Sequence, residues 1–450
     1  MQNKPFTPST SIYKDSPRVY LFWDESYFWG VLLWRALKYL KIPFATCRSE
    51  DIKQGLLQTD QARILIAPGG FASAKANSLG DKGCKAICEF VKNKGFYLGF
   101  CGGAGLALNN SPRPGLELCS WKRKPASTRL PNCSGHIKVH PACSTKYFPR
   151  ALQPPVSVPV WWPSQFQAEN NDNIYTLAKY QEPDTDFWVG DIPLACTDKQ
   201  SVQAWENIYD INLDPELLLE EPSIICGDYG QGAYLLSYLH LETPHSPAAN
   251  LWLFHILSRL EDKVANACPT DNGPIESCTI PQWDLKNISV LWDDPNLQEA
   301  VGLVQNLIRI GEENFLFCWR KTWLLGWRRG IPGFALNSLL AMLSLALEIT
   351  PGEQALNYWN AQKDYFLNML KEFHSLYQGY LIQKRLHLAR ETGNSHREPT
   401  ADLKNIKKQL VGSTEQTDLL LNRLFKILQE LIWIQISSKD SFDLSQLNTL

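Results

Sequence analysis

The stretch GFYLGFCGGAGLAL, residues 95–108, decides the fold expected of this 450-residue chain. Its first half is a short apolar run that predicts a strand, and its second half, rich in alanine and leucine, predicts a helix. Cys101 stands at the junction, and glycines follow it directly. A nucleophile on a sharp strand-to-helix turn needs such small neighbours, because backbone segments come close together there. The start of the following helix favours a thiolate. A buried cysteine in a glycine-rich turn is the structural alternative.

The sequence before this stretch alternates strand and helix patterns. Short apolar runs are separated by segments with apolar residues at helical spacing. This alternation predicts βαβ units and a parallel sheet. We therefore expect an α/β fold, a flavodoxin-like doubly wound parallel sheet with helices on both faces. The expected strands are residues 19–23, 43–47, 63–67 and 96–100, and the expected helices are residues 27–40 and 84–92.

The pattern changes between residues 110 and 230, where prolines cluster. Short β-like runs at 156–162 and 174–180 predict an antiparallel excursion from the main sheet. The sheet is then expected to resume with GAYLLSYLH, residues 232–240, and to be followed by a helix over 248–259.

A polar segment rich in turn residues separates this half from a helical C-terminal part. Apolar residues recur there at steps of three and four, over 366–380 and again over 403–431, which predicts a long antiparallel helical hairpin. Its role would be packing, with self-association or a protein partner as the wider possibility. The expected organisation is a tail at 1–17, an α/β domain at 18–262, a linker at 263–290 and an all-α domain at 291–450.

Composition narrows the class of protein. A net charge of −2 argues against a nucleic-acid-binding surface. The first residues contain no apolar targeting segment, so the cytoplasm is the expected compartment. The longest uncharged apolar stretch, Ile331 to Leu347, is shorter than a bilayer span, so we expect a buried helix and no membrane span. Most of the twelve cysteines are expected to be reduced core thiols.

Two further motifs bear on Cys101. In SYLHLETP (237–244), His240 ends a predicted strand and Glu242 follows two residues later. In an extended chain these side chains point to the same side, so the carboxylate can orient the imidazole that activates the cysteine. In IAPGGFAS (66–73) a strand runs into a Pro-Gly-Gly loop. The backbone amides expected to form an oxyanion hole are those of Gly69, Gly70 and Gly102.

The order strand–PGG, then G-x-C-x-G, then H-x-E resembles class I glutamine amidotransferases and their relatives. Within that superfamily the chain resembles most the family of the biotin–protein ligase N-terminal domain. The likeness rests on IAPGG (66–70), GFCGGAG (99–105), PVWW (159–162) with TLAKY (176–180), and GAYLLSYLHLE (232–242), and it covers residues 18–260. It implies Cys101 as nucleophile, His240 as base, Glu242 as the group that orients it, and the three glycines around the oxyanion.

The chain departs from glutamine-hydrolysing enzymes at two positions. They usually carry Gln or His four residues after the cysteine, where this chain has Gly105, and His-Pro-Glu where it reads His-Leu-Glu. A biotin ligase catalytic domain would show a Gly-Arg-Gly-Arg-type loop. The nearest string, GWRRGIPG (326–333), lacks that spacing, so biotinylation is not expected.

Other polar residues give weaker signals. Asp24, Glu25 and Tyr27 follow the end of a strand, where open α/β sheets bind ligands, and we expect them, with Gly103, to line a substrate pocket. The spacing Cys133, His136, His140 and Cys143 suggests zinc, but a strand separates the two histidines by about 13 Å. We therefore expect no metal and no cofactor.

The sequence leads to two hypotheses. The first is a cysteine-dependent hydrolase, amidotransferase-like, that acts on an amide or related acyl group. The second is a non-catalytic module that binds a small molecule or regulates a partner.

Overall fold

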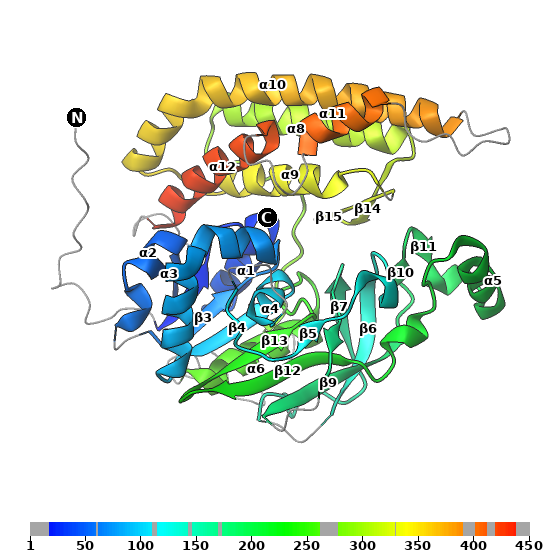
Figure 1. Cartoon of the computed structure of the whole chain (residues 1–450). Coiled ribbons are helices and arrows are strands. Elements are labelled where there is room, and N and C mark those ends of the chain that lie inside the picture. Colours follow the sequence, from blue (N-terminus) through cyan, green and yellow to red (C-terminus); the bar gives the residue numbers. More distant parts are fainter. Residues whose placement is uncertain are drawn as a thin grey trace.

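The computed structural model describes residues 18–59, 62–109, 115–142, 146–169, 173–261, 278–328, 330–389, 401–411 and 419–437. An α/β layer with one large sheet carries a helical layer above the carboxyl edge of its parallel strands (Figure 1).

Five parallel strands form one half of the main sheet, in the order β2-β1-β3-β4-β13. This is the flavodoxin-like order, and it confirms the expected fold class. Helices cover both faces, so the inner strands are buried on both sides and read as unbroken apolar runs. The strands are β1 (Val19–Phe22), β2 (Phe44–Cys47), β3 (Ile64–Ala67), β4 (Phe96–Phe100) and β13 (Gly232–Ser237).

The helices divide between two hydrophobic cores. Side chains of α1 and α6 pack with Leu21 on one face, and those of α3 and α4 pack with Tyr20 on the other. The helix predicted over 84–92 begins twelve residues earlier, because a kink at Gly80, with φ +59°, interrupts the apolar spacing. These helices are α1 (Tyr27–Tyr39), α2 (Ser49–Lys53), α3 (Ala72–Lys92), α4 (Gly102–Ala107) and α6 (Pro247–Leu260).

The other half of the sheet is antiparallel, as expected for the proline-rich middle of the chain. β12 joins it to β13, and β9, β6 and β7 follow. Its elements are β6 (Ser134–Pro141), β7 (Val156–Trp161), β9 (Ile174–Pro183), β10 (Trp188–Val189), β11 (Ile192–Pro193), α5 (Lys199–Tyr209) and β12 (Pro222–Tyr229), beside a small sheet of β5 (Lys122–Arg123) and β8 (Phe166–Gln167).

The C-terminal part contains helices and, against expectation, a β-hairpin. The hairpin holds the Trp- and Arg-rich stretch around FCWRKTW. Its first strand is mostly half-buried and its second mostly buried, so neither shows an alternation of buried and exposed residues. The second apolar stripe forms two helices rather than one, and residues 392–400 lie outside the described residues. The elements are α8 (Pro295–Glu313), β14 (Phe317–Lys321), β15 (Leu324–Trp327), α9 (Gly333–Leu347), α10 (Glu353–Ala389), α11 (Ala401–Val411) and α12 (Leu420–Ser437).

One hydrophobic core runs through both parts. Helix α9 is buried on nearly every side, and it packs against α1 below it and against α8 and α12 of the helical layer (Figure 1). Arg35 of α1 forms an ion pair with the buried Glu348 just after α9, and Trp283 donates a hydrogen bond to the same carboxylate. Across the described ranges, no helix is long and apolar enough to cross a membrane. The ten cysteines among the described residues are all free thiols.

Candidate active site

Cys101 occupies a strained turn between β4 and α4. Its φ is +46° and its ψ −103°. Residues that carry a Cβ rarely adopt this backbone conformation, and such strained residues are concentrated at functional sites in proteins. The turn is held on both sides: the Cys101 amide donates to the Ser237 carbonyl at 2.8 Å, and its carbonyl accepts from Gly105 at 2.9 Å. Small neighbours make the turn possible, since a Cβ on Gly102 would lie 1.9 Å from the Gly70 carbonyl oxygen.

The Pro-Gly-Gly loop lies directly beside this turn. Gly70 has φ +112°, and a Cβ there would lie 2.7 Å from the Glu25 carbonyl oxygen. A Cβ on Gly69 would lie 2.8 Å from the Trp29 ring. Within the described ranges, the amides of Gly69, Gly70 and Gly102 donate to no protein acceptor. These amides are therefore available to a ligand at the turn.

His240 and Glu242 form a buried pair. Nδ1 of His240 lies 2.7 Å from Oε1 of Glu242, and the side chains are 0% and 1% exposed. The expectation of an extended chain here was wrong: β13 ends at Ser237, and the Thr243 amide donates to the His240 carbonyl at 3.2 Å, which closes a turn. The turn nevertheless brings the two side chains together.

The negative charge of Glu242 affects the protonation of the His240 imidazole. Burial lowers the pKa of His240, but the Glu242 charge, together with hydrogen bonding to Cys101 and Glu242, outweighs it and raises the pKa to about 10. Nε2 has no hydrogen bond of regular geometry within the described residues, although Cys101 is close enough to act on the imidazole. The buried pair therefore keeps a positively charged imidazole close to the Cys101 side chain.

We expect Glu242→Gln to destabilise the protein most below pH 6.5 and progressively less as the pH rises through about 10. A raised histidine pKa contributes stability that is complete below the unfolded-state value of about 6.5 and is lost above the folded-state value. Chemical unfolding of both proteins at pH 6 and pH 10 measures this difference. An equal difference at the two pH values would contradict the pairing.

Aromatic residues that sequence reasoning missed enclose the histidine. Trp29 of α1 stacks on the His240 ring at 4.2 Å between centroids, and Phe334 of α9 stacks on Trp29 at 6.0 Å. Nε1 of Trp161 donates to Thr243 Oγ1 at 2.9 Å and thereby fixes the turn. The helical part thus reaches the His240–Glu242 pair through a single intervening ring, that of Trp29.

The loop that carries Asp24, Glu25 and Tyr27 lies at the carboxyl edge, as predicted, but its polar groups already have protein partners. Asp24 accepts from the Ser49 amide at 2.8 Å, and the Tyr27 hydroxyl donates to Glu25 at 2.7 Å. Burial and then the Glu25 charge raise the pKa of Tyr27. Gly103 packs under the turn, where a Cβ would lie 2.0 Å from the Ala67 carbonyl oxygen.

Helix α12 covers this loop. Trp23 and Gln429 exchange two side-chain-to-carbonyl hydrogen bonds of 3.4 and 3.2 Å. The ring of Phe425 stacks on Tyr27 at 4.6 Å, and Glu430 pairs with Arg48 at 2.8 Å. The end of β1, where a ligand is expected in this fold, is therefore roofed by the C-terminal part.

Lys75 is a second group that sequence reasoning missed. It lies in the first turns of α3, just after the glycine loop, and is completely buried. Burial lowers its pKa to about 7, against the opposing charges of Glu25, Asp24 and Cys101. The signal available in the sequence was a lysine within the small-residue stretch FASAKANS.

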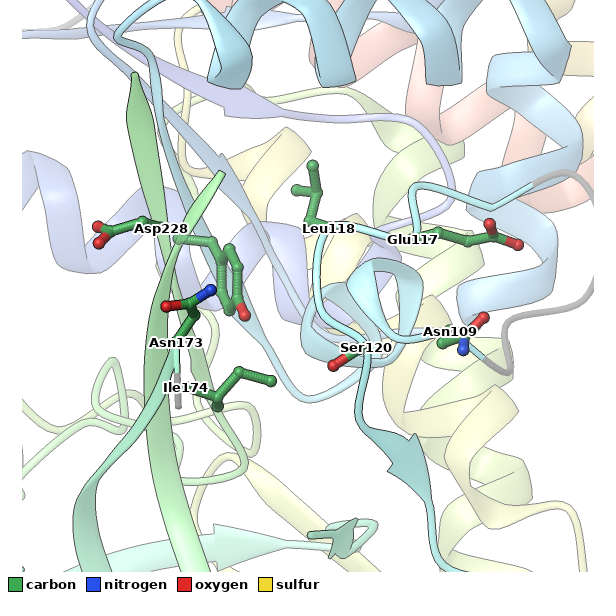
Figure 2. Close-up of a pocket in the computed structure, with 8 residues that line it drawn as sticks. Asn109, Glu117, Leu118, Ser120, Asn173, Ile174 and Asp228 are labelled. Carbon is green, nitrogen blue, oxygen red and sulfur yellow. The ribbon is translucent and has the colours of Figure 1, made fainter. Parts of the chain in front are cut away.

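Two of the cavities bordered by described residues lie away from Cys101, His240 and Glu242 and next to the antiparallel half of the sheet. One, of about 350 Å³, is shown in Figure 2; Asn173 and Asp228 border it on one side and Asn109 and Ser120 on the other, and Tyr234 at the start of β13 also lines it. The other, of about 280 Å³, lies between the antiparallel half of the sheet and the β14–β15 hairpin. Its lining includes Ser134, Trp162, Trp188, Arg320 and Trp327.

The two histidines of the zinc-like spacing contact different residues. The prediction of a strand over the histidines is confirmed by β6, where His136 bonds Asp186 at 2.9 Å and His140 lies 3.7 Å from Glu220. Cys143 lies outside the described residues. Within the described part of the chain, no group of three or more His, Cys, Asp or Glu side chains could hold a metal ion.

No protein family and no curated protein matches the chain. Solved structures with a related arrangement include a protein from Thermoplasma acidophilum assigned as one of the subunits of GMP synthase, 12% identical over 55% of this chain and 94% of that one, with a TM-score of 0.34. A β-galactosidase from a Rahnella species is 14% identical over 56% of this chain but only 32% of its own length, with a TM-score of 0.32. A glutamine amidotransferase from Thermotoga maritima is 12% identical over 56% of this chain and 90% of that one, with a TM-score of 0.31. Glutamine amidotransferase-like proteins are thus among the structures that this chain is similar to, at a level that carries no argument about activity.

Proposed function

We propose that the protein is a cysteine-dependent hydrolase of the amidotransferase-like type that cleaves an amide or related acyl group. The observation that carries the proposal is the combination of a strained Cys101 turn with a buried His240–Glu242 pair beside it. The sequence likeness to the biotin–protein ligase N-terminal domain family, over residues 18–260, supports the same assignment.

In this reaction the Cys101 thiolate attacks the substrate carbonyl carbon, and the former carbonyl oxygen takes up the negative charge. The backbone amides of Gly69, Gly70 and Gly102 donate hydrogen bonds to that oxygen in the proposed reaction. The His240 imidazolium gives its proton to the leaving amine, and the carbon–nitrogen bond breaks. The neutral imidazole then takes a proton from the water that hydrolyses the thioester, while Glu242 keeps the ring oriented.

A binding or regulatory module is the second candidate. It is favoured by the packing of α12 on the loop after β1 and of Trp29 on His240, and by Gly105, where glutamine-hydrolysing enzymes carry a polar side chain. The two candidates differ in one measurable property, the reactivity of the cysteine.

We expect iodoacetamide to label Cys101 rapidly below pH 7, and His240→Ala to slow that labelling by about 100-fold, because the imidazolium that favours the thiolate is lost. Peptide mass spectrometry reads the rate at each pH, with the exposed Cys196 as an internal reference. Hydrolysis of p-nitrophenyl esters and anilides in the same variants then tests for turnover. Labelling of Cys101 at the rate of Cys196, unchanged in His240→Ala, would reject the hydrolase and leave the binding module.

A further inference from the structure

Lys75 occupies a buried position, where a charged amine costs free energy of folding. Its ammonium is withdrawn from water, and its helix position points the side chain back toward the positive N-terminal end of α3. Its two hydrogen bonds go to neutral oxygens, Ser26 Oγ at 2.5 Å and the Asp24 carbonyl at 3.3 Å. An apolar side chain of the same length would fill this space without these costs.

The contacts of Lys75 join the loops that form the site. A Cβ on Gly70 would lie 3.6 Å from its Cε, so the side chain passes directly against the glycine loop. Its amine reaches the loop between β1 and α1 and lies 5.3 Å from the centre of the Phe22 ring. Lys75 therefore links the loop bearing two of the expected oxyanion amides to the loop at the end of β1.

The charges that face the amine come from two elements. Asp24 and Glu25 lie on the loop after β1, and Cys101 lies on the turn after β4. Asp24 is in turn 3.8 Å from Arg48. Cys101 is thus among the groups whose charge acts on the amine of Lys75.

We propose that Lys75 is a positioning residue of the Cys101 site, whose protonated amine clamps the loop after β1 against the glycine loop and adds positive charge that favours the Cys101 thiolate. The inference rests on the proposed function, and it assigns to the site a second positively charged side chain beside His240. The amine loses its proton near neutral pH, so its contribution is largest in mildly acidic solution and is gone by pH 9.

The test compares iodoacetamide labelling of Cys101 in wild type and Lys75→Met at pH 6 and pH 9. We expect about a tenfold slower rate at pH 6, the order expected for the loss of one charge across a partly buried site, and rates within about twofold at pH 9. Lys85→Met, on the exposed side of the same helix, is the matched control and should label as wild type. An equal loss at both pH values, or no loss, would overturn the proposal.

A second measurement does not depend on the folding of Lys75→Met. In protein labelled with 13C at lysine Cε, Lys75 should appear as the lysine that titrates near pH 7, and Cys101→Ser should lower that midpoint because the coupling is reciprocal. An unchanged midpoint would reject the coupling. The two hypotheses fail separately: rapid His240-dependent labelling that Lys75→Met leaves unaltered rejects only the role of Lys75, whereas labelling that ignores His240 rejects the hydrolase.

Discussion

Gly102→Ala should destabilise the protein by roughly 3 kcal/mol or more and abolish the rapid labelling of Cys101. The added Cβ would lie 1.9 Å from the Gly70 carbonyl oxygen and 2.7 Å from its carbon. Both atoms belong to the backbone, so neither can swing aside as the tip of a side chain could. The glycine loop and the Cys101 turn must separate, which removes the expected oxyanion amides from the nucleophile. Urea unfolding and the labelling assay measure the two effects.

Gly105→Ala is the matched control, since it lies in the same short helix. Among the residues that the structure describes, a Cβ there would meet only the Cβ of Ala72, at 3.6 Å, which is an ordinary contact. Alanine is also the better helix former by about 1 kcal/mol. This variant should therefore be as stable as wild type or slightly more stable. Equal behaviour of the two alanine variants would mean that the close approach at Gly102 does not hold the site together.

A fragment that ends at Glu261 should fail to fold as a soluble monomer. Helix α1 is apolar around most of its circumference, because the sheet covers one side and α9 covers the other. Removing the C-terminal part exposes this second side, including Phe28, which packs against Phe334 of α9, and leaves Arg35 without Glu348. Such a large apolar patch leads to association or loss of the native state. Circular dichroism and light scattering of the purified fragment measure the outcome.

A chain that ends at Ser437 is the control, because it keeps every described element of the helical part. It should be soluble and unfold in one cooperative transition. A monomeric, cooperatively folding fragment ending at Glu261 would show instead that the α/β half is an independent domain, as the polar segment after residue 262 suggested.

Local signals were sufficient for the parallel half of the sheet. The runs at 19–23, 43–47, 63–67 and 96–100 lie within one residue of β1 to β4, because buried strands between turn residues are short, continuous and apolar. The β14–β15 hairpin was not predicted, because buried and exposed side chains do not alternate along either of its strands.

The residues that surround the candidate site could not be predicted from local sequence patterns. Trp29 meets His240 across more than 200 residues, and Lys75 meets Ser26 across 49 residues. Neither contact leaves a trace in the spacing of neighbouring residues. The loop after β1 is covered by α12. The sequence of α12 alone indicates only a helix with one apolar face.

The position of α1 between the sheet and α9 also has a consequence for folding during synthesis. Helix α1 ends at Tyr39, and its covering helix α9 begins only at Gly333. At roughly 5–20 residues per second, a ribosome needs about 15 to 60 seconds to synthesise the intervening chain. Throughout that interval one side of α1 is an apolar surface without its partner, which is the kind of surface that chaperones bind. The rate of translation between these two helices is therefore expected to influence how much of the newly made protein reaches the native state.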